Sequence, residues 1–450
     1  MRMGRIMCNV NEGEKYQVIV VGGGPAGCAA AIASAREGKS TLLIEATSAL
    51  GGMSTMGLVP FWCPFSDGKQ LVYRGIAEKI FKRSTEYVAN NPEGKLNWVS
   101  IYPEALKRIF DDEVAQAGAR ILFQTQVGSV VVEDRSIKGI LAVNKAGLTL
   151  YQADVYIDAT GDGDVAAGAG AEFLKGRADG SLQSATHCFA IANVDTYGYE
   201  HVLGRRMKNG DALRAEGEKT RICTLLKDDP EIDLITDEHF CNAMYAPGAV
   251  GFNAGHLEEV DGTDPAAVSQ ALIKGRRIAH QFEEGLKKHA PEAFGNAWLS
   301  LTGPLLGIRE SRRIVCDHNL TVEDYLERRS FEDEIGRSRY YIDVHFTNEE
   351  VANGTAFTYE KYGYGESHGI PYGSLIPRGI DNLLVAGRCI GSDSMVNGAI
   401  RVMPTCMVTG EAAGTAAAMA VECEGRTRDI DVAKLQSRLE EYGAYLHLDK

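Results

Sequence analysis

Near its start the chain alternates short apolar runs with one alanine-rich segment of helical character. Residues 17–21 (QVIVV) form a short apolar, β-branched run, which is typical of a strand buried on both faces, and residues 40–45 (STLLIE) are predicted to form the second strand. Between them, residues 25–38 (PAGCAAAIASAREG) begin with proline and end with glycine, as a helix commonly does. This order predicts a strand–helix–strand unit and therefore an α/β fold with a doubly wound, mostly parallel sheet.

The turn between the first strand and the helix carries three glycines in a regular spacing. Gly22 permits a tight turn, Gly24 lets the backbone approach a pyrophosphate, and Gly27 allows the helix to pack closely on the strand. The amino terminus of the helix then presents free N–H groups to the phosphates. Glu45, at the end of the second strand, is placed to bind ribose hydroxyls and would repel a 2′-phosphate. These residues predict a dinucleotide site.

Later segments predict the rest of the architecture. Residues 153–170 read as a strand and a glycine-rich turn, and residues 382–420 as a strand, a glycine-broken loop and a long alanine-rich helix. Between them we expect strands at HCFAIANVD (187–195) and YYIDVHFT (340–347) and a helix over residues 264–289. The domains predicted are residues 15–185 with 371–425 for the dinucleotide, an inserted α+β substrate domain at 186–370, a closing helix at 426–450 and a flexible tail at 1–14.

Several motifs together resemble those of FAD-dependent oxidoreductases whose flavin domain is shared with fumarate reductase and succinate dehydrogenase flavoproteins and with ketosteroid dehydrogenases. The motifs are GGMSTMG, DATGDGD, GIRESRRI, YIDVH, GIPYGSLIPRGIDNLLVAGR and NGAIRVMPTCMVTGEAAG. They run from about Gln17 to Ala420 and are most similar to a soluble, single-chain bacterial branch. The resemblance implies FAD as the cofactor and a Rossmann-like, discontinuous FAD-binding domain.

The same resemblance implies where FAD would lie. The backbone of Val127, in a strand over ILFQTQVGSVVVED (121–134), would contact the adenine, Gly387 and Arg388 would reach the pyrophosphate, and a helix beginning near Val402 would point at the pyrimidine edge of the flavin. The full expected set is Gly22, Gly24, Pro25, Ala26, Gly27, Glu45, Ala46, Gly51, Gly52, Met53, Ser54, Val127, Ala159, Thr160, Gly161, Gly387, Arg388, Arg401 and Val402.

Two absences bear on the cofactor and its partner. Several relatives attach FAD through an early histidine, but this chain has no histidine before His187, so we expect non-covalent FAD, with a thioether to Cys63 as the alternative. No second G-x-G-x-x-G follows a predicted strand. We therefore expect no NAD(P)H domain and a separate electron acceptor or donor.

Polar residues in the middle of the chain are the catalytic candidates. Arg309, beside Glu310, Arg312 and Arg313, would hold a carboxylate or carbonyl group, or would belong to a structural ion-pair network. His345 would act as a general base with Asp343 setting its tautomer, or would be a solvated or core histidine without a catalytic role. His368 and Tyr372 lie in a loop leading back to the flavin domain. Weaker candidates are His187, Asn253 and His256.

Composition and charge narrow the partners. The formal net charge of −14 argues against nucleic acid and anionic membranes. No run approaches the length of a spanning helix, and residues 1–14 lack the apolar core of a signal peptide, so a cytoplasmic location is expected. The cysteines are scattered, without C-x-x-C pairs, and the histidine spacing predicts no metal site. A homodimer is compatible with the sequence.

The function predicted is hydride transfer between flavin N5 and a carbon of a small polar substrate bearing hydroxyl or carboxylate groups. Reduction of an activated C=C bond uses the same parts and remains an alternative. A flavoprotein subunit of an electron-transfer complex is another, although the chain shows no cysteine cluster and no basic docking patch.

Overall fold

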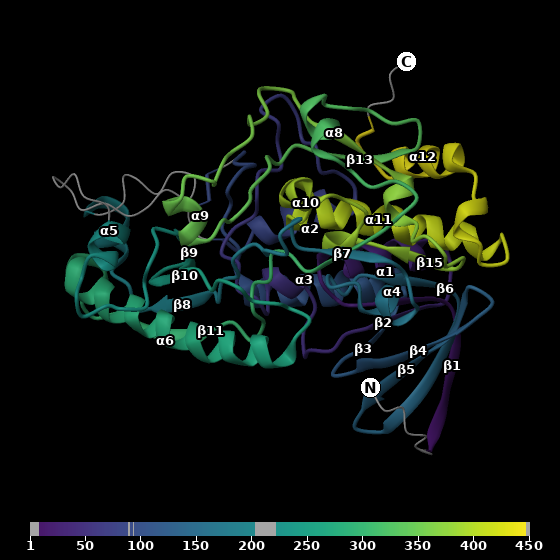
Figure 1. Cartoon of the computed structure of the whole chain (residues 1–450), viewed down its shortest axis with the longest axis horizontal. Coiled ribbons are helices and arrows are strands. Elements are labelled where there is room, and N and C mark those ends of the chain that lie inside the picture. The colour runs from purple at the N-terminus through teal and green to yellow at the C-terminus, as the bar shows by residue number, and fades with distance from the viewer. Residues whose placement is uncertain (1–8, 89–90, 93, 203–221, 447–450) are drawn as a thin grey trace.

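The computed structural model describes residues 9–88, 91–92, 94–202 and 222–446, and its larger body is built on a parallel sheet. Five parallel strands lie in the order β3-β2-β1-β6-β15. They are β1 (Val10–Val21), β2 (Thr41–Ile44), β3 (Arg120–Leu122), β6 (Gly147–Asp158) and β15 (Leu383–Val385). The side chains of Val18–Val21 and Thr41–Ile44 are all buried, as expected for strands covered on both faces. The predicted α/β fold is confirmed (Figure 1).

An antiparallel hairpin extends the amino-terminal half of β6. Strand β5 (Ser136–Asn144) pairs antiparallel with β6, with Ile140 opposite Tyr151. Strand β4 (Gln126–Glu133) pairs antiparallel with β5 and forms the edge of the sheet. The single strand expected over residues 121–134 is wrong, because β3 pairs in parallel with β2 whereas β4 pairs antiparallel with β5, and Gln124 between them has a φ of +51°. The flexible tail predicted for residues 1–14 is also wrong from Val10 onward, because β1 begins at Val10 and pairs with β6. Residues 1–8 lie outside the described part.

Two helices pack against each other across the large body with backbones in close contact. Helix α1 (Pro25–Arg36) lies on α11 (Met403–Val421), which is buried along nearly its whole length. A Cβ atom at Gly410 would lie 2.1 Å from the Ala26 carbonyl oxygen, and one at Gly414 would lie 2.2 Å from that of Ala30. Only residues without side chains allow this approach. Further helices of the large body are α2 (Ile76–Thr85), α3 (Pro103–Ala117), α4 (Asp164–Gly168), α10 (Ser394–Ile400) and α12 (Val432–Glu441).

The second body is a four-stranded antiparallel sheet covered on one face by a long helix (Figure 1). Its order is β11-β8-β10-β9, formed by β8 (Phe189–Ala192), β9 (Phe240–Ala246), β10 (Ala249–Ala254) and β11 (Trp298–Thr302). Helix α6 (Pro265–His289) is capped by the Asp264 carboxylate and packs Phe282 against Phe189. Side chains alternate between the two faces of a strand. The opposite face of this sheet lies against the large body, where a Cβ atom at Gly251 would lie 3.0 Å from the side chain of Pro60.

The chain returns to the large body earlier than expected. The second hydrophobic core draws its members from Ala185 to Leu306, whereas residues from Ile314 onward pack in the first core, so the predicted boundary at residue 370 differs from the packing. The returning segment forms β12 (Arg312–Ile314) against β7 (Phe173–Lys175) and β13 (Glu334–Ser338) against β14 (His368–Pro371). Short helices α5 (Ile222–Lys227), α7 (Pro291–Phe294), α8 (Val322–Leu326) and α9 (Asn348–Ala352) complete the fold.

The strand expected at residues 340–347 does not form, because its backbone bonds to side chains and loops instead of a neighbouring strand. The Asp343 carbonyl accepts a hydrogen bond from the Arg401 guanidinium, and the His345 carbonyl accepts one from the Ser184 N–H. The segment thereby runs extended between the two bodies.

Replacing Gly414 with valine should lower the free energy of unfolding by about 3 kcal/mol, because the two helices must separate to admit the side chain. Chemical denaturation measures this change. The control is Ala433→Val, on the exposed side of α12, which reports the helix propensity of valine alone. An equal loss of stability in both variants would contradict the close-packing argument.

Candidate flavin and substrate site

The glycine-rich turn has the geometry expected of a dinucleotide loop. Gly22 has a φ of +94°, which side chains rarely permit. A Cβ atom at Gly27 would lie 1.7 Å from the Gly22 carbonyl oxygen, so the helix packs directly on the turn. Gly24 has an ordinary φ of −69°, and a Cβ atom there would meet nothing within 4 Å. The protein itself therefore does not require glycine at position 24. The space in front of Gly24 is open, and a glycine there would let a bound group approach the backbone.

Glu45 and the second glycine pair lie beside this turn. The buried Glu45 carboxylate accepts hydrogen bonds from the N–H groups of Gly23 and Thr47, at 2.5 and 2.7 Å. The Gly51 N–H donates to the Gly23 carbonyl at 2.8 Å, and a Cβ atom at Gly52 would lie 2.9 Å from the Gly24 Cα. The expected residues Ala46, Met53 and Ser54 follow in the same loop and its 3₁₀ turn.

Two segments from distant parts of the sequence close around the turn. Ala159 follows β6, and its carbonyl oxygen would lie 2.5 Å from a Cβ atom at Gly22. Gly387 follows β15, and a Cβ atom there would lie 2.9 Å from the Ala26 side chain. Burial raises the pKa of the Asp158 carboxyl to about 6, although it accepts hydrogen bonds from Thr160 and Ala166. The structure thus brings the predicted pieces 22–27, 51–54, 159–161 and 387 together.

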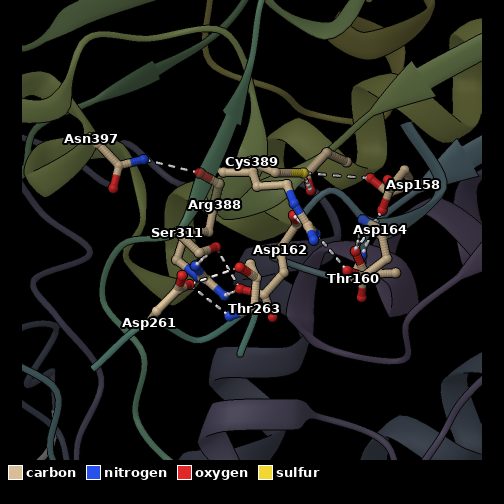
Figure 2. Close-up of polar contacts among 12 residues, drawn as sticks. Asp158, Thr160, Asp162, Asp164, Asp261, Thr263, Ser311, Arg388, Cys389 and Asn397 are labelled. Atoms are coloured by element: carbon tan, nitrogen blue, oxygen red, sulfur yellow. Dashed lines mark hydrogen bonds and ion pairs between the residues drawn. The ribbon is translucent and has the colours of Figure 1, made fainter. Parts of the chain in front are cut away.

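Arg388 is held in a polar network (Figure 2). Its guanidinium donates to the Asp162 carboxylate and to the Ser311 hydroxyl, each at 2.7 Å, and the Asn397 amide donates to the Arg388 carbonyl. The network joins the loop after β15 to the loop after β6 and to the returning segment. Contact of Arg388 with a pyrophosphate stays a prediction, as does contact of the Val127 backbone, at the start of β4, with the adenine.

The start of α11 offers unused donors. Val402 occupies its N-cap position without a side-chain hydrogen bond, so the first N–H groups of the helix have no cap from that residue. Arg401 donates from Nη2 to the Asp343 carbonyl at 2.8 Å, while its buried Nε has no partner among the described residues. These donors, and the space in front of Gly24, fit the pyrimidine edge and the pyrophosphate of FAD.

Burial raises the pKa of the nearby Cys63 thiol to about 12, which disfavours the thiolate needed for a thioether.

A second polar group surrounds Arg309, between the small sheet and the start of α11. Nη1 of Arg309 donates to the Ser184 carbonyl at 2.5 Å and the Thr186 hydroxyl at 2.8 Å. Nη2 lies 3.5 Å from both His239 Nε2 and Asn253 Oδ1, at the limit of a hydrogen bond. Burial, together with the charge of Arg401, lowers the pKa of Arg309 to about 10.

His345 and Asp343 complete this group, although they do not lie on a strand. His345 Nε2 lies 3.5 Å from an Asp343 carboxylate oxygen, which also accepts a hydrogen bond from the Tyr340 hydroxyl at 3.2 Å. Burial, with Arg309 nearby, lowers the pKa of His345 to about 3. Burial alone would raise the pKa of Asp343, but His345, Arg401 and Arg309 hold it well below its ordinary value.

Three histidines gather here, contrary to what their spacing along the chain suggested. One ring nitrogen from each of His239, His256 and His345 lies within 4.8 Å of the others, a grouping wide enough to consider for a metal ion. The rings of His239 and His256, however, are stacked at 4.3 Å and nearly parallel. Parallel rings do not aim their in-plane lone pairs at one point, and the Arg309 cation faces His239 Nε2. This geometry is suited to hydrogen bonding.

The structure does not bring the other candidates to this group. His368 is buried beside Tyr325, and its Nδ1 lies 2.7 Å from the Tyr362 hydroxyl. The Tyr372 hydroxyl donates to the Thr427 carbonyl in the core. His187 lies under α6, with Nε2 2.8 Å from the Gly303 carbonyl oxygen.

Glu310 and Arg313 form a buried ion pair, and Arg312 pairs with Asp164. These contacts agree with the structural alternative considered for the residues around Arg309.

Sequence reasoning missed His239 and Asp237. Both lie at the entry to the hairpin β9–β10, whose turn contains Pro247 and Gly248. The turn at Pro247 and Gly248 was the available signal in the sequence. A hairpin paired through this turn places His239 opposite Gly255, and in the structure the Gly255 N–H donates to the His239 carbonyl.

Replacing Gly24 with alanine should leave the melting temperature of the apoprotein nearly unchanged but weaken FAD binding about tenfold or more, because the methyl group enters the open space. Flavin fluorescence titration measures the affinity. The contrasting variant Gly27→Ala should destabilise the apoprotein itself, since its Cβ would collide with the Gly22 carbonyl. Unchanged FAD affinity in Gly24→Ala would refute this placement of the pyrophosphate.

Comparisons with curated proteins find relatives over part of the chain. Digeranylgeranylglycerophospholipid reductase of Methanocella arvoryzae is 30% identical over 158 residues, which cover 33% of this chain and 39% of that protein. The enzyme of the same name from Methanospirillum hungatei is 30% identical over 154 residues, or 30% and 35% of the two chains. The matches thus span less than two fifths of these relatives.

Solved structures resemble the chain more broadly but more distantly. A geranylgeranyl bacteriochlorophyll reductase-like protein of Thermoplasma acidophilum is 14% identical, with a TM-score of 0.46 over 95% of this chain and 83% of that one. An anhydrotetracycline hydroxylase of Streptomyces rimosus is 11% identical, with a TM-score of 0.46 over 95% and 65%.

Across the part of the chain that the structure describes, none of the helices has the length and apolar character to cross a membrane. The family model described as FAD dependent oxidoreductase matches residues 17–439, nearly the whole chain and all of the cofactor loops described above. The chain therefore belongs to the FAD dependent oxidoreductase family, with FAD as its cofactor.

Proposed function

We propose that this enzyme oxidises a small polar substrate bearing a hydroxyl or carboxylate group. The observation that carries the proposal is a polar group beside the start of α11, in which Arg309 is buried and His345, Asp343 and Arg401 are largely buried. Burying charged groups is costly unless they are paired or used, so a site of this composition favours a polar ligand over an apolar one.

Arg309 would anchor the substrate through a carboxylate or carbonyl oxygen. Its Nη1 is committed to Ser184 and Thr186, which hold the guanidinium in place. Among the described residues, the hydrogen-bond contacts of its Nη2 are both at 3.5 Å, so this nitrogen can turn to a closer and better-aligned oxygen of a ligand. Removal from water strengthens such an interaction.

His345 would take the proton from the substrate hydroxyl. Its lowered pKa keeps the imidazole uncharged near neutral pH, which is the form that accepts a proton. The Asp343 carboxylate, 3.5 Å from Nε2, stabilises the imidazolium formed when that nitrogen gains the proton. Arg401 and Tyr340 hold Asp343 in position. Bound FAD would supply the hydride acceptor, through its N5 atom.

Reduction of an activated C=C bond is the second candidate. The curated relatives named as reductases favour this direction, while their names describe only those proteins. In such a reaction Arg309 would polarise the activating carbonyl, and His345 would deliver a proton. In either direction a separate electron acceptor or donor is needed to restore the flavin, and we propose no membrane or nucleic-acid partner.

Substitution of Arg309 by methionine should slow FAD reduction by a bleaching substrate by about 10²–10³-fold, because the desolvated anchor is lost. The assay exposes the holoenzyme to a panel of small hydroxylated and carboxylated compounds without oxygen and follows the visible flavin absorbance. Arg277→Met, at an exposed position of α6, is the matched control and should retain the rate. A normal rate in Arg309→Met with FAD still bound would exclude this role.

The rate of substrate-dependent FAD reduction should stay level between about pH 8 and about pH 5, because His345 remains uncharged above its lowered pKa of about 3. A histidine with an ordinary pKa would instead lose activity as the pH falls below about 6.5. Stopped-flow rates across this range test the point, and a tenfold fall per pH unit below that value would contradict it.

A further inference from the structure

A continuous line of polar contacts leads from His345 away from the start of α11. His345 Nδ1 lies 2.9 Å from His256 Nε2, and His256 Nδ1 lies 3.5 Å from an Asp237 carboxylate oxygen. At the other end, His345 Nε2 lies 3.5 Å from Asp343. Two imidazoles in direct contact are thus flanked by two carboxylates, on segments separated by about 20 to 100 residues of sequence.

The contact between the two rings links their tautomers. Only one of the two facing nitrogens can carry the proton when both rings are neutral. If His345 donates from Nδ1, then His256 Nε2 accepts, His256 Nδ1–H faces Asp237, and His345 Nε2 keeps a free lone pair. If His256 donates instead, His345 carries its proton on Nε2 and has no lone pair there. Only the first arrangement leaves His345 able to accept a proton on the substrate side.

We propose that Asp237, acting through His256, is a positioning residue that holds His345 in the Nδ1–H tautomer and forms the outer end of a proton relay. This inference rests on the proposed function. A proton arriving from the substrate hydroxyl bonds to His345 Nε2, the Nδ1 proton passes to His256 Nε2, and the His256 Nδ1 proton passes to Asp237 and then to water. One proton moves along the line, and no electrons move with it; the hydride goes to FAD.

The position of Asp237 suits this task. Its carboxylate also accepts hydrogen bonds from the backbone N–H groups of His239, at 2.7 Å, and His256, at 3.0 Å, which fix its orientation. Burial alone would raise its pKa, but the His256 side chain and these N–H groups keep the pKa below its ordinary value, so Asp237 stays an acceptor. The Asp237 side chain is 10% exposed and lies between the exposed residues Thr236 and Glu238, so the outer end of the relay lies near the protein surface.

Other charged groups face the inner half of the relay. Arg309 and Arg401 oppose a permanent positive charge on His345, and the third ring, that of His239, lies edge-on to His345 at 5.0 Å and is itself held uncharged by burial and by its neighbours. A proton that reaches His345 is therefore driven outward, toward Asp237 and away from the two guanidinium groups.

Histidine side-chain NMR on the FAD-bound enzyme tests the relay without any substrate. Long-range ¹H–¹⁵N spectra distinguish the two tautomers of each ring, and the variants His256→Gln and His345→Gln assign the signals. We expect Nδ1–H tautomers for both rings in the unaltered protein. In Asp237→Asn, the loss of the outer carboxylate should let Asp343 dominate, so that His345 changes to the Nε2–H tautomer. His256→Gln should produce the same change in His345 by an independent route.

The matched control is Glu238→Gln, a neighbouring carboxylate that pairs with Lys227, and it should leave both tautomers unchanged. An Nε2–H tautomer of His345 in the unaltered protein, or no change in either relay variant, would overturn the proposal. Stoichiometric metal in the purified enzyme, with histidine shifts that reverse on chelation, would also overturn it. Failure of the proposed function appears separately, as correct tautomers in an enzyme whose FAD no polar compound reduces.

Discussion

The structure depends on how closely the backbones of the glycine-rich turn, helix α1 and helix α11 approach one another. Gly27 sits on the carbonyl of Gly22, Gly410 on that of Ala26, and Gly414 on that of Ala30, at distances that leave no room for a side chain. Helix α1 is therefore held between the turn and α11, and both helices consist mainly of small residues. Packing this close couples the position of the cofactor loop to that of α11, because a displacement of one helix is transmitted to the other.

This rigid base determines where the chemistry lies. The start of α11 is set by the packing of the helix, and Arg401, one residue before its N-cap, is carried to the boundary between the two bodies. There it meets Asp343 on the extended segment returning from the small sheet. The strand alternation of that sheet assigns one face to α6 and the other to the boundary, so Asn253 reaches Arg309 while Phe252 packs in the core.

Electrostatics at the boundary follow from burial combined with close pairing. Two guanidinium groups and two carboxylates lie among three imidazoles, and the cations together with burial keep His345 uncharged, while the carboxylates stay ionised. Such an arrangement keeps a base unprotonated near neutral pH and provides a hydrogen-bonded exit for the proton it receives. The Arg388–Asp162–Ser311 network fastens the returning segment to the cofactor loops, which keeps the two halves of the site in register.

Local patterns in the sequence determined the parallel sheet, the glycine-rich turn with Glu45, the long helices 265–289 and 403–421 and the FAD-dependent family, because each depends on neighbouring residues or on a fixed spacing. Tertiary structure alone decided the rest. The apolar and polar alternation of residues 340–347 resembles a strand, yet the side chain of Arg401 and the backbone of Ser184 take up its hydrogen bonds. His368 looked catalytic in its glycine-rich loop but is enclosed by Tyr325 and Tyr362. Asp237, His256 and His345 meet only because the small sheet folds against the returning segment, a contact between residues far apart in the chain that no local pattern encodes.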